Sequence, residues 1–173
     1  MVGEKEAVIL VNQNGKAIGR CGKPEAHRKG LLHRAFSVFI FNEQGELLLQ
    51  KRSRKKYHFG GLWSNSCCSH PQPGENVRSA ARRRLQEELG IAVPLKVCGS
   101  VKYLFNDMKS GLTEHEFDIV MAGKYSGAII FPHGEIEEVK WIQVHELRRE
   151  LRLYPARFTP WLPVTLPLAN LCD

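Results

Sequence analysis

One segment of the chain carries a strong helical pattern, and its place among strand-like segments limits the folds open to the chain. Residues 76–89 read NVRSAARRRLQEEL, with Asn76 as a candidate N-cap and Gly90 as the stop. Apolar residues recur there at helical spacing, so we expect one helix face to pack on a core through Val77, Ala80, Ala81, Leu85 and Leu89. The 173 residues suffice for one domain with such a core.

Strand-like runs and turns surround this helix. We expect strands at residues 7–12, 35–42, 46–51, 96–105, 114–122 and 138–143, and a second helix at 144–151. The runs 35–42 and 46–51 flank a Gly-containing turn, which predicts a hairpin. The long stretch 53–74 lacks periodicity, and a loop of this length inside a compact domain is typically functional. The proline-containing tail 155–173 is expected to be ordered but irregular, with room for a short helix. This order predicts an α/β or α+β domain, with a mixed sheet flanked by helices.

Domain count and location follow from what the sequence lacks. Neither repeats nor low-complexity tracts interrupt it, so a single domain over residues 1–173 is expected. Its apolar runs fall short of the roughly 20 residues that cross a bilayer, and we expect a cytoplasmic location. The five cysteines lack the paired spacing of a disulfide framework, which predicts free thiols in a reducing compartment.

The formal net charge of +7 has three interpretations. It can be a solvated basic surface, or it can serve an anionic ligand, either nucleic acid or a small phosphate ester. Charge alone leaves these open, and the positions of the basic residues have to decide.

The helical segment resembles the Nudix signature. The register matches at seven positions, which are Glu75, Arg83, Leu85, Glu87, Glu88, Gly90 and Ile91. Two positions depart from it, with Ser69 in place of a glycine and Arg84 in place of a glutamate. Arg84 and Glu88 share a helix face, which suits one Mg²⁺ and a diphosphate better than several metal ions around a water. For the helix alone, a surface ion pair is the alternative.

Further motifs along nearly the whole chain resemble the type 1 isopentenyl-diphosphate isomerases, an offshoot of the Nudix fold. WSNSCCSHP at 63–71 is similar to that family's W-[ST]-N-x-x-C-x-H-P, TEHE at 113–116 to its E-x-E strand, and TPW at 159–161 to its [ST]-P-W. The resemblance implies a Nudix-like mixed β-sheet sandwiched between helices. It also implies an enzyme of isoprenoid biosynthesis that interconverts isopentenyl and dimethylallyl diphosphate. The alternative is a Nudix hydrolase of a nucleoside diphosphate derivative.

The resemblance also implies two metal sites. Glu114 and Glu116 alternate along an expected strand, so both leave one face. Together with three histidines they would bind one divalent ion, Mn²⁺, Mg²⁺ or Zn²⁺, and those histidines are His27, His33 and His70. Mg²⁺ is expected with the diphosphate on Glu88, with the Cys68 carbonyl as a further ligand. Three histidines outside any motif are expected on the surface: His58, His133 and His145.

The family's acid–base pair maps onto Cys68 and Glu116. Cys68 has the family's spacing to His70, whereas Cys67 is interpreted as packing. The reaction protonates an unactivated alkene and removes a different proton from the opposite face. Glu116 is expected to deliver the proton, relayed by Tyr103, with the Cys68 thiolate as the base. By resemblance, Trp161 faces the carbocation and excludes water, with core packing as the alternative.

Four basic residues match the family's phosphate-binding cations and would have to converge in the fold: Lys23, Arg52, Lys56 and Arg84. They favour a small allylic or homoallylic diphosphate over nucleic acid as the partner. The run Arg82–Arg84 is followed by Glu87 and Glu88, and no nucleic-acid motif accompanies it. We expect no membrane partner, and the resemblance suggests a monomer.

Overall fold

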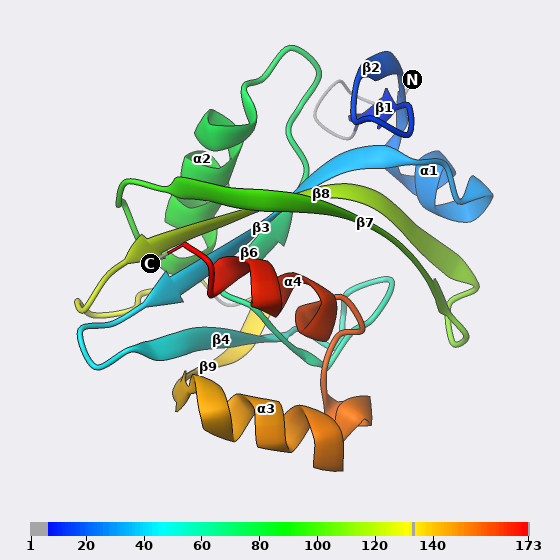
Figure 1. The fold of residues 1–173 in the computed structure, drawn as a ribbon. Helices are drawn as coiled ribbons and strands as arrows, with labels where there is room; N and C mark the ends of the chain where they lie inside the picture. Colours follow the sequence, from blue (N-terminus) through cyan, green and yellow to red (C-terminus); the bar gives the residue numbers. More distant parts are fainter. Residues whose placement is uncertain (1–6, 133, 173) are drawn as a thin grey trace.

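The protein is described by a computed structural model over residues 7–132 and 134–172, and within these ranges it forms one mixed sheet of nine strands with helices on both faces (Figure 1). The expected α+β class is confirmed. The strands are β1 (Ala7–Val11), β2 (Ala17–Gly22), β3 (His33–Phe41), β4 (Glu46–Arg52), β5 (Trp63–Ser64), β6 (Cys67–Ser69), β7 (Lys96–Asp107), β8 (Leu112–Lys124) and β9 (Ile136–Gln143). The helices are α1 (Lys23–Lys29), α2 (Val77–Leu89), α3 (Val144–Leu153) and α4 (Leu162–Ala169), with a 3₁₀ turn, η2, at Pro155–Arg157.

The long strands β3, β7 and β8 form the part of the sheet that carries the polar side chains described below. β8 runs parallel to β3, with His33 opposite Glu116, and antiparallel to β7, with Tyr103 opposite Glu116. Since paired residues of neighbouring strands face the same side of a sheet, these three side chains form a row across three strands.

β3 and β4 leave the predicted turn but do not continue as a hairpin. They pair only at Phe41 and Leu47 and then diverge, with β6 on β3 and β5 on β4. The loop between β5 and β6 satisfies backbone groups that hairpin partners would otherwise have paired. Asn65 donates to the Val38 carbonyl at 3.0 Å, and the Ser66 hydroxyl donates to the Leu48 carbonyl at 2.7 Å. The predicted hairpin is therefore correct at its turn and wrong beyond it.

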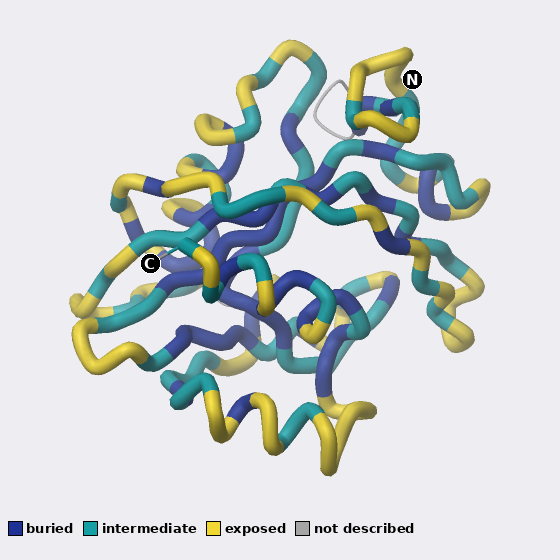
Figure 2. Tube along the Cα trace, in the orientation of Figure 1, coloured by how far each residue is buried: buried dark blue, intermediate teal, exposed yellow. Residues whose placement is uncertain are grey.

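The predicted helix α2 is confirmed, and it covers one face of the sheet (Figure 1). The Asn76 side chain accepts hydrogen bonds from the backbone N–H groups of Arg78 and Ser79, and Gly90 ends the helix with φ 66°. Its apolar face packs into one core as expected, with Ala80, Ala81, Leu85 and Leu89 buried and Val77 packed against them. A second core on the other face joins the sheet to α3 and α4, and Figure 2 shows the buried trace between these layers.

The elements that sequence patterns did not predict are short. β2 and α1 have six and seven residues, and β5 and β6 have two and three residues inside the irregular stretch. Segments of this length hold too few turns or alternations for a periodic signal, and tertiary packing stabilises them. The described helices are all too short or too polar to cross a membrane.

Two cysteines are joined, which corrects the expectation of free thiols throughout. Cys98 on β7 forms a disulfide with Cys172, which follows α4 and lies 74 residues further along the chain. Cys21, Cys67 and Cys68 are free. Spacing could not reveal the pair because the packing of α4 against β7 brings the two residues together.

This crosslink predicts a measurable stabilisation. Replacing Cys98 with Ser should lower the free energy of unfolding by about 2–4 kcal/mol, because the bond closes a long loop in the unfolded chain. Urea denaturation without reductant would measure it, and the free Cys21→Ser variant is the control. Wild-type protein equally stable with and without dithiothreitol would contradict this expectation.

Candidate active site

Five side chains from four parts of the chain converge on one point. His27 comes from α1, His33 opens β3, His70 follows β6, and Glu114 and Glu116 lie on β8. One ligand atom from each lies within 4.8 Å of the others. The parallel pairing of β3 and β8 places His33 beside Glu116, and β6 carries His70 to the other side of β3. The structure thus brings together the five residues predicted from the sequence.

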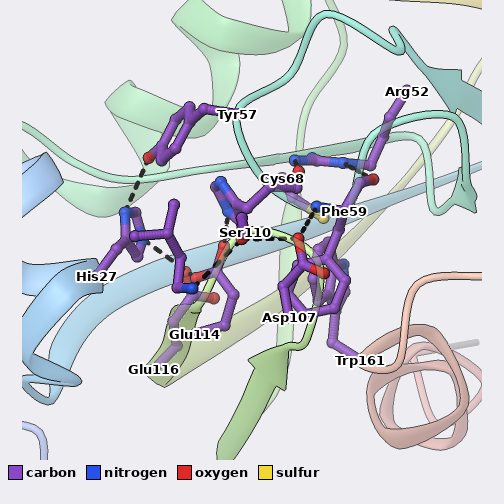
Figure 3. Close-up of polar contacts among 12 residues, drawn as sticks. His27, Arg52, Tyr57, Phe59, Cys68, Asp107, Ser110, Glu114, Glu116 and Trp161 are labelled. Atoms are coloured by element: carbon purple, nitrogen blue, oxygen red, sulfur yellow. Dashed lines mark hydrogen bonds and ion pairs between the residues drawn. The ribbon is translucent and has the colours of Figure 1, made fainter.

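The chemistry of these donors fits a divalent cation. His33 Nδ1 lies 2.8 Å from the Leu31 carbonyl, and His27 Nδ1 lies 2.8 Å from the Tyr57 hydroxyl (Figure 3), so both rings can direct Nε2 into the cluster. Among the described residues, the buried atoms His27 Nε2 and Glu114 Oε2 have no hydrogen-bond partner. Burial and the neighbouring His33 hold the pKa of His70 well below its usual range, which keeps its imidazole neutral. Imidazole nitrogens beside carboxylates are donors of the kind that such an ion takes.

His58 does not lie on the surface as expected. It is buried, and its Nε2 contacts Glu114 Oε1. Although burial raises the pKa of Glu114, its contacts with His27 and His58 hold that pKa well below the usual range. His58 therefore orients one carboxylate of the cluster. His145 is exposed as predicted, and His133 lies outside the described residues.

Glu116 connects the histidine cluster to Tyr103. Its Oε1 lies 2.8 Å from His70 Nε2, and its Oε2 accepts a hydrogen bond from the Tyr103 hydroxyl at 2.5 Å. Burial raises the pKa of Glu116, and the nearby charge of Glu114 adds to the effect. One carboxylate therefore faces the metal ligands with one oxygen and a phenol with the other.

The two adjacent cysteines point in different directions. Cys67 is buried in the core beneath α2, as expected for a packing residue, whereas Cys68 lines the pocket that holds the cluster. The Cys68 thiol donates to Asn65 Oδ1 at 2.9 Å. Burial raises the pKa of Cys68 to about 12, with the charge of Asp118 adding to it. The free protein therefore holds Cys68 as a thiol, not as the thiolate expected from the sequence.

Trp161 lines the same pocket and is 3% exposed. Its indole N–H donates to Ser64 Oγ at 3.2 Å, and the Arg52 guanidinium lies 5.4 Å from its ring centre. The Tyr103 ring stacks nearly parallel to it, with centroids 6.5 Å apart. Cys68, Glu116 and Trp161 lie around one space in Figure 3.

The four predicted cations also converge, since Lys23, Arg52, Lys56 and Arg84 all line this pocket. In the free protein, protein groups already contact these cations. Arg52 donates to the His58 and Phe59 carbonyls. Arg84 donates to Glu88 at 2.6 Å, so the helical ion pair considered as an alternative forms as well. Burial and the neighbouring Lys56 lower the pKa of Lys23.

Glu135, which the sequence did not single out, lies between two of these cations. Its carboxylate is 2.8 Å from Lys56 Nζ and 2.9 Å from the Arg84 guanidinium. Although burial raises the pKa of Glu135, Lys56 and Arg84 lower it to about 2. Glu135 precedes β9 outside any motif, so no local signal marks it. Asp118, also missed, had a signal, because it continues the alternation of Glu114 and Glu116 along β8.

Comparisons with known proteins agree with this geometry. A family model described as NUDIX domain matches residues 31–162. "Isopentenyl-diphosphate Delta-isomerase 2" of Aromatoleum aromaticum is 43% identical, covering 97% of this chain and 88% of that protein. "Isopentenyl-diphosphate Delta-isomerase" of Serratia proteamaculans is 45% identical, covering 90% and 87%. A crystal structure from Deinococcus radiodurans shares the fold with a TM-score of 0.76 and 21% identity, covering 94% of this chain and 99% of that one.

The position of His58 generates a prediction about metal affinity. His58→Ala should weaken binding of Mn²⁺ or Zn²⁺ to the metal-free protein by about 10–100-fold, because partners that orient a ligand carboxylate contribute this much. Competition with a chromophoric chelator would measure the affinity, and His145→Ala on the surface is the matched control. Equal affinities for His58→Ala and wild type would show that His58 does not support the cluster.

Proposed function

Since the chain belongs to the isopentenyl-diphosphate Delta-isomerase family of NUDIX-domain proteins, we propose that it interconverts isopentenyl and dimethylallyl diphosphate with Cys68 and Glu116 as its acid–base pair. The observation that carries this assignment is one pocket lined by the Cys68 thiol, the Glu114 and Glu116 carboxylates and four cations. A Nudix hydrolase of a nucleoside diphosphate derivative is not favoured, because the helix carries Arg84 where that chemistry needs a carboxylate.

The reaction requires one group to protonate the alkene and another to remove a different proton. Cys68 lies on β6 and Glu116 on β8, the two strands that flank β3, so they approach the pocket from different sides. Glu116 delivers the proton through the hydroxyl of Tyr103, and Cys68 accepts the other once it is a thiolate. The charge of Arg52 lowers the pKa of Cys68 toward that state, against the effect of burial. The reverse reaction exchanges the two roles.

The carbocation-like intermediate needs protection from water and a surface that tolerates positive charge. The buried indole of Trp161 supplies an electron-rich face within the pocket. The ring of Tyr103 stacks nearly parallel to it. An intermediate of this kind would otherwise be captured by a loose water.

The diphosphate binds, on this proposal, to Lys23, Arg52, Lys56 and Arg84, all of which line the pocket. Glu88 would hold Mg²⁺ against it, with the Cys68 carbonyl as a further ligand, and Gln50 fixes Glu88 through a hydrogen bond of 3.0 Å. A divalent ion on the five-residue cluster, Mn²⁺, Mg²⁺ or Zn²⁺, would fix both β8 carboxylates and neutralise their charge.

We further propose a single domain over residues 1–173, acting as a monomer in the cytoplasm without nucleic-acid or membrane partners. Cys68 is free in the structure, as the reaction requires.

An isotope experiment tests the reaction and the identity of the thiol. In D₂O with Mg²⁺ and isopentenyl diphosphate, the protein should form dimethylallyl diphosphate with deuterium on its carbons, followed by NMR. Cys68→Ala should lower kcat by at least about 100-fold, because it removes a positioned proton-transfer group. Cys67→Ala, the matched control, should keep activity in the folded fraction. Phosphate release without isomerisation would sink the proposal in favour of a hydrolase.

Glu135 should compete with the substrate for its cations. Glu135→Gln frees Lys56 and Arg84 from a carboxylate, so KM for isopentenyl diphosphate should fall by about tenfold, in line with the loss of one charge-assisted hydrogen bond. Steady-state kinetics would measure it. Glu137→Gln, whose carboxylate pairs with the exposed Arg54 outside the pocket, should leave KM unchanged. A higher KM in Glu135→Gln would show instead that Glu135 holds the cations in place.

A further inference from the structure

β8 extends its polar face one step beyond the two carboxylates of the metal cluster. Glu114, Glu116 and Asp118 alternate along this strand and so face the same side of the sheet. Asp118 is fully buried, and within the described part of the chain its hydrogen bonds go to hydroxyl groups and to no cation. Neither the acid–base pair nor the metal cluster includes it.

One oxygen of Asp118 joins two hydroxyl groups. Its Oδ2 accepts a hydrogen bond from Ser37 Oγ at 2.6 Å and lies 2.9 Å from the Tyr103 hydroxyl, whose single proton it shares with Glu116. Ser37 Oγ lies 3.6 Å from Cys68 Sγ, and the Tyr103 hydroxyl lies 2.5 Å from Glu116 Oε2. Asp118 is therefore the middle member of a chain of polar contacts that ends on the two groups of the acid–base pair.

The register of the sheet holds every member of this chain. Ser37 pairs with Cys68 across β3 and β6, and Tyr103 pairs with Glu116 across β7 and β8. Asp118 follows Glu116 on the same face of β8 and pairs with Ala35 of β3. Side chains mounted on paired strands are held more accurately than side chains on loops, which suits a constellation that must be fixed.

Asp118 is a poor choice for stability. Its second oxygen, Oδ1, is buried without a hydrogen-bond partner among the described residues. A buried carboxylate that lacks a cation and leaves one oxygen unpaired disfavours the folded state. A neutral residue of the same size would avoid this penalty. We therefore look for the contribution of Asp118 in the two hydroxyl groups that it contacts.

We propose that Asp118 is a positioning residue of the isomerase, which fixes the hydroxyls of Ser37 and Tyr103 and through them orients Cys68 and Glu116 toward the substrate. This rests on the proposed function, because it assigns Cys68 and Glu116 to the reaction. Without Asp118, the Tyr103 oxygen keeps only its bond to Glu116, and Ser37 loses the acceptor that directs it beside Cys68.

The variant Asp118→Leu, of similar size, tests the proposal, because it removes the oxygen that contacts both hydroxyls. With isopentenyl diphosphate, kcat should fall by about 100-fold, the loss typical of a misplaced reacting group, while KM stays at the wild-type value. The melting temperature should stay equal or rise, because the buried charge is gone. In a double-mutant cycle with Tyr103→Phe, the combined loss should be smaller than the product of the single losses, since the two residues act through one contact.

A second variant keeps the test decisive even if Asp118→Leu folds poorly. Ser37→Ala removes the link to Cys68 and should lower kcat, and the loss of its buried hydrogen bond to Asp118 should also lower the melting temperature. Ser66→Ala is the structural control, because within the described residues this buried hydroxyl bonds to the backbone of Ile40 and Leu48. The variant should lower the melting temperature while kcat is kept. Wild-type kcat in both Asp118→Leu and Ser37→Ala, or an equal loss of kcat in Ser66→Ala, would overturn the positioning role alone. If the wild-type protein lacks isomerase activity, the proposed function itself is wrong, and the positioning role is wrong with it.

Discussion

The divergence of β3 from β4 is the constraint on which the rest of the structure depends. The two strands share one pair, Phe41 with Leu47, and then separate. Buried backbone N–H and C=O groups must find partners, and here Asn65 and Ser66 satisfy groups on the inner edges of the opened strands. Because these side chains replace the hairpin hydrogen bonds, the segment from β5 to β6 can pair within the sheet. It places Cys68 beside β3, where a continuous hairpin would have left no room for it.

The second consequence is a buried face of the sheet that carries polar and ionisable side chains. β7, β8 and β3 carry Tyr103, Glu116 and His33 in one row, and His27 and His70 complete the surroundings from α1 and the end of β6. Burial disfavours charge on each of these groups, so their neighbours decide which of them stays charged. Two histidines hold the pKa of Glu114 low, whereas that of Glu116 is raised beside the charge of Glu114. Neighbouring carboxylates on one strand thus acquire different properties.

Local sequence patterns predicted the helices and strands whose periodicity is visible within one short segment of the chain. α2 has its N-cap at Asn76 and its stop at Gly90 as expected, because the cap, the apolar face and the glycine are adjacent in the sequence. The same alternation placed Glu114 and Glu116 on one face of β8, and continued by one step it would have found Asp118. It could not show that β3 and β4 separate, because the groups that replace their pairing lie in the loop beyond β5.

The sequence by itself determined the class of fold, and its motifs and their spacing indicated the cysteine, histidines, carboxylates and cations that gather at the site. Only the tertiary structure decided what surrounds them. His58 is buried against Glu114, Glu135 lies between Lys56 and Arg84, and Cys98 is bonded to Cys172, each through contacts between distant parts of the chain. The Cys68 thiol is protonated for the same reason, since the pKa of a buried group depends on the dielectric and the charges that the folded chain places around it.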